Sequence, residues 1–197
     1  MRNRLCTFST IALATSLALT GCGDSGSHSG GHGDSAEPSA SASSAAFNDA
    51  DAKFATMMIP HHQQAIEMSD MLLAKDGADP KVAQLAKDVK EAQGPEIEQL
   101  KKWSDEWNVG ADHGSGHAGH GDGMMSGDDM KALEDADGPS ASKLYLEQMI
   151  EHHEGAVAMA KTEIEEGQHA EAVDMAREIV ASQTKEIETM RTLLSEL

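Results

Sequence analysis

Cysteine is almost absent from this sequence. Its 197 residues include two cysteines, Cys6 and Cys22, and both lie in the first 22 residues. The rest of the chain therefore has no disulfide bond and no thiolate that could bind a metal ion. Any metal site there must be built from nitrogen, oxygen or thioether sulfur.

Aromatic residues make up only 3% of the chain, and β-branched residues are scarce. Ala, Glu, Lys, Met and Leu are abundant instead, which favours helices over strands. Basic residues are also outnumbered, with 15 Lys and Arg against 34 Asp and Glu. Such an acidic chain repels nucleic acid and anionic lipid, so neither is expected as a partner, and it attracts cations. For the charge taken alone, simple solubility is the preferred explanation.

The first 21 residues have the pattern of a bacterial lipoprotein signal peptide. Arg2 and Arg4 precede an apolar stretch over residues 11–19, which is too short to persist as a membrane-spanning helix. The stretch leads into a Leu-Thr-Gly-Cys sequence that ends at Cys22, as in a lipoprotein cleavage site. We therefore expect residues 1–21 to be removed. Acyl chains such as palmitate on Cys22 would then anchor the protein to the extracytoplasmic face of the bacterial cell membrane.

Two low-complexity segments divide the remaining chain. Residues 22–46 are a Gly-, Ser- and Ala-rich tether with too few apolar residues to fold, so we expect this tether to be disordered. A second segment, residues 109–140, is a loop rich in His, Met and Gly. On either side of this loop lie two blocks, 48–108 and 141–197, which together form one predicted domain over residues 47–197.

The two blocks are copies of each other. Residues 58–68 align with residues 149–159, and each copy contains a Met-x-x-His-His sequence. Residues 86–100 then align with residues 176–190. A duplication of this length predicts an all-α, ferritin-like four-helix bundle, in which two helical hairpins bury their apolar faces against each other. The central loop is expected to cross the length of the bundle.

Capping residues predict the ends of the helices. The expected helices run from Asn48 or Asp49 to about Lys75, from Asp79 and Pro80 onward, from residues 140–142 to Gly167, and from about Gln168 to the C-terminus, with a short extra helix at 128–136. Pro60 and Pro95 fall inside the first two helices. The duplicate has no proline there, so we expect kinks rather than breaks.

Helical periodicity places polar residues on the inward faces of all four long helices. They are His61 and His62, Gln93 and Glu96, His152 and His153, and Gln183 and Glu186. Their positions along the helices place them all near the midpoint of the bundle, with His61 at the edge of its apolar stripe. A buried polar group without a partner costs several kcal/mol, so these groups must satisfy one another, bind something, or lie at an opening.

Histidine and methionine together favour copper, because imidazole suits several transition metals whereas thioether selects soft Cu(I). The candidate ligands are Met58, His61, His62, Met68, Met149, His152, His153 and Met159. We interpret the inward-facing Gln and Glu residues as groups that do not bind the metal themselves but orient the imidazoles through hydrogen bonds. An auxiliary set that would capture metal first lies in the central loop: His113, His117, His120, Met124 and Met125. Methionine at helical spacing is, however, also a common filler of apolar cores.

The paired motifs MMIPHHQQAIEM and QMIEHHEGAVAMA, with the repeated Gln-x-x-Glu-Ile and the Met-rich loop, resemble the bacterial family catalogued as domain of unknown function 305. The resemblance covers about residues 47–197. It implies a ferritin-like four-helix bundle that is often exported, with some members linked to copper binding or copper tolerance. The sequence departs from the family pattern at Gln64, where Gly is usual, and at Gln148, where Met is common. The second departure leaves Met57 without a counterpart.

Three functions are compatible with this pattern. The first is a tethered protein, not an enzyme, that buffers or sequesters copper outside the cytoplasm. The second is a scaffold or interaction lipoprotein in which the His, Gln and Glu layer is a buried polar network that specifies how the hairpins pair. The third is a dinuclear-metal oxidase, but such sites use Glu-x-x-His on two helices and neither motif contains it.

Overall fold

The computed structural model describes residues 46–110 and 123–197, and over these ranges the chain forms five α helices and no strand. The helices are α1 (Asp49–Leu73), α2 (Pro80–Glu106), α3 (Gly127–Asp135), α4 (Gly138–Glu166) and α5 (Ala170–Glu196). The predicted all-α class is confirmed. Cys22, the tether, and His113, His117 and His120 lie outside the described residues. None of the described helices is both long and apolar enough to cross a membrane.

Most predicted helix ends agree with the structure. Asn48 caps α1 in a capping box, and Asp79 caps α2 with Pro80 in its first turn. The predicted short helix is α3. The start of α4 was placed too late: Asp137 is its N-cap and accepts a hydrogen bond from the Ser140 backbone N–H at 2.9 Å. Helix α5 begins at Ala170, slightly later than predicted.

Both internal prolines lie within continuous helices, as predicted. Pro60 is inside α1 and Pro95 is inside α2, and neither ends its helix. Each proline removes one backbone donor, but the surrounding turns continue because the helices are held by packing along their full length. The histidine pair that follows Pro60 therefore keeps a helical register, which fixes the direction of both imidazoles.

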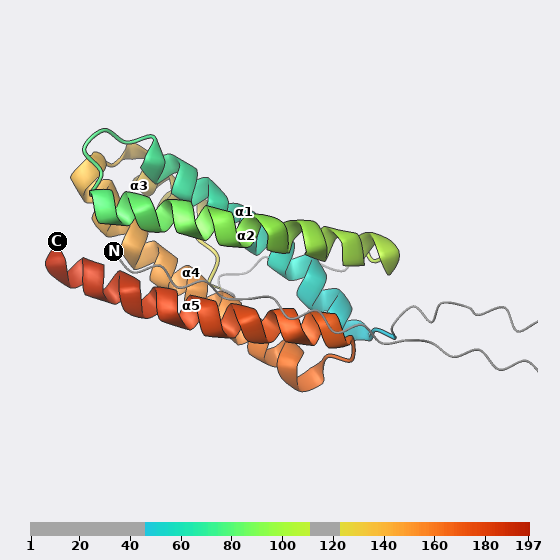
Figure 1. Cartoon of the computed structure of the whole chain (residues 1–197). Coiled ribbons are helices and arrows are strands. Elements are labelled where there is room, and N and C mark those ends of the chain that lie inside the picture. Colours follow the sequence, from blue (N-terminus) through green and yellow to red (C-terminus); the bar gives the residue numbers. More distant parts are fainter. Residues whose placement is uncertain (1–45, 111–122) are drawn as a thin grey trace, which may run out of the picture. The chain divides into compact units, whose positions relative to one another are not determined.

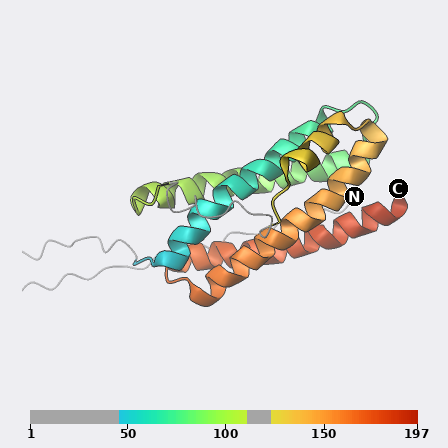
Figure 2. The same ribbon diagram turned by 180° about the vertical axis from the view of Figure 1, so that it is seen from behind.

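The hairpin of α1 and α2 packs on the hairpin of α4 and α5, mainly through α1 and α4 (Figures 1 and 2). Two contacts show that α1 and α4 are antiparallel. Near one end, the Asn48 side chain donates to the Glu166 carbonyl at 2.8 Å. Nearer the other end, the Ser69 and Tyr145 hydroxyls lie 2.9 Å apart. Helix α2 therefore runs in the same direction as α4.

The apolar core is divided into two clusters. We call the cluster near the α1–α2 turn the upper cluster, and it contains Met68, Leu72, Leu85, Tyr145 and Met149 among others. The lower cluster, at the opposite end, contains Phe54, Met58, Leu100, Trp103 and Ile179 among others. The polar residues that the sequence directs inward fall between the two clusters along the helices. The core is thus interrupted at its centre by a buried polar layer.

Candidate metal centre

The four predicted histidines meet at the middle of the bundle. His62, His152 and His153 have no exposed surface, and His61 is 1% exposed. The rings of His61 and His152 come from opposite hairpins, yet their centres lie 3.8 Å apart. Within each pair the ring centres are farther apart, at 6.4 Å for His61 and His62 and 6.3 Å for His152 and His153. His61 therefore lies at the hairpin interface, not at the edge of the apolar stripe as predicted.

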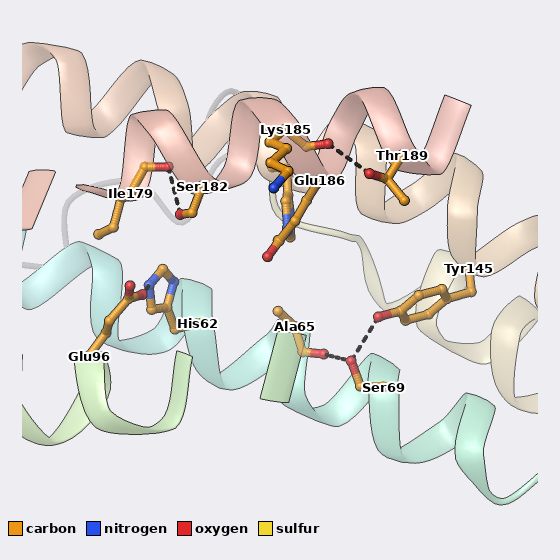
Figure 3. Close-up of polar contacts among 11 residues, drawn as sticks. His62, Ala65, Ser69, Glu96, Tyr145, Ile179, Ser182, Lys185, Glu186 and Thr189 are labelled. Carbon is orange, nitrogen blue, oxygen red and sulfur yellow. Dashed lines mark hydrogen bonds and ion pairs between the residues drawn. The ribbon is translucent and has the colours of Figure 1, made fainter. Parts of the chain in front are cut away.

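His62 and His153, which we call the outer histidines, each interact with a glutamate from their own hairpin. His62 Nε2 lies 2.7 Å from Glu96 Oε2, and His153 Nε2 lies 2.6 Å from Glu186 Oε2. Figure 3 shows the His62–Glu96 pair, with Glu186 on the facing hairpin. A carboxylate accepts, so in a neutral imidazole the Nε2 carries the proton and Nδ1 keeps its lone pair. The predicted orienting role of the two glutamates fits this geometry.

Several buried polar atoms of the layer have no hydrogen-bond partner among the described residues. They include Nδ1 of His62 and His153, both side-chain amide atoms of Gln93, and Oε1 of Gln183. Both ring nitrogens of His152 also lack a hydrogen bond of ordinary geometry. An unsatisfied buried polar group is costly, and most of these atoms are acceptors, so their concentration points to a ligand that accepts their lone pairs.

His152 is kept in the neutral form that metal ligation requires. Burial, followed by the neighbouring imidazoles of His61, His153 and His62, lowers the pKa of His152 well below its usual range. A contact with the His61 backbone counteracts this shift only in part. An imidazolium would also repel the other rings in this layer, whereas a neutral imidazole presents a lone pair to a cation.

The predicted methionine ligands separate into two groups. Met58 and Met149 are fully buried and lie one helical turn from His62 and His153. Met68 and Met159 are seven residues from His61 and His152, a rise of about 10 Å along a helix. Met68 packs in the upper cluster, and Met159 lines a surface pocket between α1 and α4. Met58 and Met149 are therefore the sulfur atoms best placed beside the imidazoles.

The donor set fits a soft ion better than a hard one. Among the described residues, no group of three or more His, Cys, Asp and Glu side chains is arranged to hold a metal ion. An ion at this layer would therefore need thioether sulfur to complete its coordination by imidazole. Cu(I) accepts such mixed ligands, while zinc and iron sites draw on thiolates or on additional carboxylates.

The two departures from the family pattern hold the crossover segment in place. Gln64 on α1 donates to the Met125 carbonyl at 2.9 Å and accepts from the Met125 backbone N–H at 2.7 Å. Gln148 on α4 donates to the Asp129 carbonyl at 2.9 Å. The Met125 side chain is buried in the upper cluster, whereas Met124 is half-buried. Sequence reasoning missed these contacts because nothing in the repeat marks them.

A third contact pins the same segment to α4. Gly123 has a φ of 74°, and a Cβ there would lie 2.6 Å from the Glu151 carbonyl and 2.9 Å from Gly155 Cα. Gly155 is the repeat equivalent of Gln64. At these equivalent positions the first repeat binds the segment through an amide, whereas the second has no side chain where the segment approaches. We call residues 123–126 the strap, which crosses from α4 to α1 beside the histidine layer.

Comparison with known proteins supports the resemblance. A family model described as "Domain of unknown function (DUF305)" matches residues 51–194. A crystal structure of a DUF305 protein from Streptomyces coelicolor, inferred to be secreted, is 36% identical, with a TM-score of 0.69 over 75% of this chain and 91% of that one. No curated protein matches the sequence.

Two further solved structures that resemble this chain are metal-bound forms of one protein, CopM. CopM in the Cu(I)-bound form is 30% identical and covers 74% of this chain and 96% of its own, with a TM-score of 0.63. CopM in the Cu(II)-bound form is 33% identical with the same coverage and TM-score.

Proposed function

The chain belongs to the DUF305 family, and we propose on that premise that it binds copper in its buried histidine layer and buffers or sequesters it outside the cytoplasm. The observation that carries the proposal is the set of buried imidazoles, among which Nδ1 of His62 and of His153 has no partner within the described residues. The fully buried Met58 and Met149 lie one helical turn from these histidines. The likeness to copper-bound CopM supports the same ion.

The proposed ligands are the four histidines with Met58 and Met149. Met68 and Met159, the other methionines that the sequence suggests, lie about two helical turns from the histidines, in the upper cluster and in a surface pocket, and are not assigned to this layer. Glu96 and Glu186 would orient the outer imidazoles, and Gln93 and Gln183 would line the layer. When bound, a copper ion would be held by neutral imidazole and thioether, so binding is expected to favour Cu(I). His113, His117, His120, Met124 and Met125 remain a proposed auxiliary set that delivers metal to the layer.

The proposed setting is a lipid anchor at Cys22 on the extracytoplasmic face of the membrane. The signal-peptide pattern of residues 1–21 supports it, and the likeness to a protein inferred to be secreted agrees. We also propose a ferritin-like topology, because α2 and α4 run in the same direction and one long crossover segment joins them. A binding role rather than catalysis is supported by the absence of Glu-x-x-His from both motifs.

The scaffold hypothesis is supported less well. A polar network that only specifies hairpin pairing is expected to satisfy its own hydrogen bonds. Here Gln93 and Gln183 are buried and leave amide atoms without partners among the described residues. A layer with unsatisfied buried polar atoms would destabilise a protein in which it served only to pair the hairpins. It is better suited to a site in which a bound ligand satisfies those atoms.

Methionine-to-leucine substitution tests the proposal without opening a cavity. In Met58→Leu/Met149→Leu the volume is nearly retained and the sulfur is lost, so stability should change little while Cu(I) affinity falls. Met190→Leu is the matched control, because Met190 is equally buried but lies on α5. Competition with a coloured Cu(I) chelator measures affinity. Unchanged binding in the double variant and in His152→Ala would reject the proposed function.

A further inference from the structure

A surface pocket lies between α1 and α4 on the lower side of the histidine layer. Its lining includes Phe54 and Met57 from α1 and Met159 and Glu163 from α4. Gly155 and Ala158 also line the pocket, and their small size leaves space there. We propose that this pocket is a second, solvent-facing site for a soft monovalent metal ion, with the thioethers of Met57 and Met159 and the Glu163 carboxylate as ligands.

The first argument concerns the two sulfur atoms. Met57 and Met159 are half-buried and line the same pocket from opposite helices. A methionine that only fills the core is normally enclosed, as Met58 is in the lower cluster. Met57 packs on neither apolar cluster in the described part of the chain, whereas Met159 packs partly on the lower cluster and also lines the pocket. Two half-buried methionines that line one pocket offer a pair of thioether donors, which a soft ion prefers.

The second argument concerns a buried carboxyl group. Glu163 is 1% exposed, lines the pocket, and accepts no hydrogen bond from any N–H or hydroxyl among the described residues. Its neighbour is the Asp51 carboxyl, which is already bonded by backbone N–H groups of Asn48, Gln168 and His169. Two buried carboxyl groups thus face each other, and over the described ranges no Lys or Arg forms an ion pair with either.

In the metal-free protein Glu163 interacts with the Asp51 carboxyl and holds a proton there. A cation in the pocket would replace that proton, whereas an anion or a neutral apolar molecule would not compensate the charge of the buried carboxylate. A hard divalent ion would gain little from the two sulfur atoms. The combination of one carboxylate with two thioethers therefore selects a soft ion of low charge, of which Cu(I) is the physiological example and Ag(I) the stable substitute.

The position of the pocket relates it to the buried layer. Met57 lies one helical turn from His61, and Met159 lies two turns from His152. Gly155, which lines the pocket, is also the residue on which the strap rests. An ion held by Met57 and Met159 would therefore be near the buried imidazoles while still in contact with solvent. The identity of this ion rests on the proposed function, but the existence of the pocket site does not.

The test is an Ag(I) titration of the full chain labelled with ¹³C at the methionine methyl groups. Signals of Met57 and Met159 should shift on addition of Ag(I), separately from those of Met58 and Met149. Met57→Leu/Met159→Leu should lose about one metal equivalent. The control Met71→Leu/Met130→Leu replaces two half-buried methionines that pack on the upper cluster and should lose none.

Three results would overturn the pocket site. They also distinguish failure of the pocket site from failure of the proposed copper site in the histidine layer. If Met58 and Met149 respond while Met57 and Met159 do not, the pocket site is rejected and the proposed function stands. If no methionine responds and no Ag(I) binds, both are rejected. If Glu163→Gln binds Ag(I) as well as the unmodified chain does, the carboxylate is not a ligand and the site as proposed is wrong.

Discussion

The imidazoles of His61 and His152, which belong to opposite hairpins, lie with their ring centres 3.8 Å apart in the middle of the bundle. The internal duplication explains this arrangement. Because α1 and α4 are antiparallel copies, equivalent positions near their midpoints face each other across the interface. A motif that occurs twice in the sequence thereby becomes a single four-histidine layer, which neither hairpin could form alone.

The glutamates of this layer should tune metal affinity more than stability. Glu96 accepts from His62 at 2.7 Å, and its side chain is 21% exposed. In Glu96→Gln the acceptor loses its charge, so the imidazole becomes less basic and its orientation less fixed. We expect Cu(I) affinity to fall by about 10- to 100-fold, as for other outer-shell partners. Chelator competition measures this, with the exposed Glu98→Gln on the same helix as control. Equal affinities would contradict the orienting role.

Glu163 should make the stability of the metal-free protein depend on pH. Burial, together with the neighbouring Asp51, raises the pKa of Glu163 from 4.5 to about 8. Between these values the folded protein holds a proton that the unfolded chain has released, so the contribution of Glu163 to the free energy of unfolding falls as pH rises and levels off above about pH 8. The lowered pKa of His152 acts in the opposite sense below its usual value of 6.5, so the slope due to Glu163 is measured between pH 6.5 and 8. Urea unfolding at several pH values measures the slope.

Glu163→Gln should remove that slope, because the amide can donate to Asp51 at every pH. Glu166→Gln is the matched control: Glu166 lines the same pocket but is exposed, so the slope should remain. The same slope in Glu163→Gln and in the unmodified chain would show that Glu163 is not the group responsible.

The strap should depend on glycine at one position. At Gly123 the φ of 74° and the close approach of the Glu151 carbonyl both oppose a side chain. Gly123→Ala is therefore expected to cost about 1–3 kcal/mol of stability or to release the strap from α4. Gly127→Ala, where a Cβ would meet nothing within 4 Å, is the control and should cost little. Thermal unfolding and hydrogen exchange at Met125 would show the loss, and unchanged protection there would refute it.

Two buried hydroxyl groups beside the layer should be coupled. Ser69 and Tyr145 lie 2.9 Å apart, and the Ser69 hydroxyl also donates to the Ala65 carbonyl (Figure 3). Because Ser69 donates to Ala65, the hydroxyl of Tyr145 is the donor to Ser69. A double-mutant cycle with Ser69→Ala and Tyr145→Phe should give a coupling energy of about 1 kcal/mol. Strictly additive effects on unfolding would mean that the hydrogen bond contributes nothing.

Local sequence rules predicted the helices and their polar inward residues, but not the contacts between hairpins. Asn48 and Asp79 mark helix starts because capping is satisfied within a few residues of chain. His61 was placed at the edge of a stripe because periodicity locates one apolar face, whereas α1 contacts both α2 and α4. Spacing along one helix also cannot indicate that Met159 faces a surface pocket.

The strap and the carboxyl pair were missed for the same reason. Gln64 reaches Met125 and Asp51 faces Glu163 across large separations in sequence, and no local pattern marks such pairs. The duplication predicted the histidine layer more fully than helical periodicity did. It required the two histidine pairs to occupy equivalent places, and an antiparallel pairing of α1 and α4 then brought them together.

The most direct test is ¹⁵N spectroscopy of the histidine rings during titration of the full chain with Ag(I). If the buried layer binds the metal, Nδ1 of His62 and His153 should shift and couple to silver, while their Nε2 atoms stay protonated and bonded to Glu96 and Glu186. If silver binds elsewhere while these nitrogen signals do not move, the buried histidine layer is not a metal site.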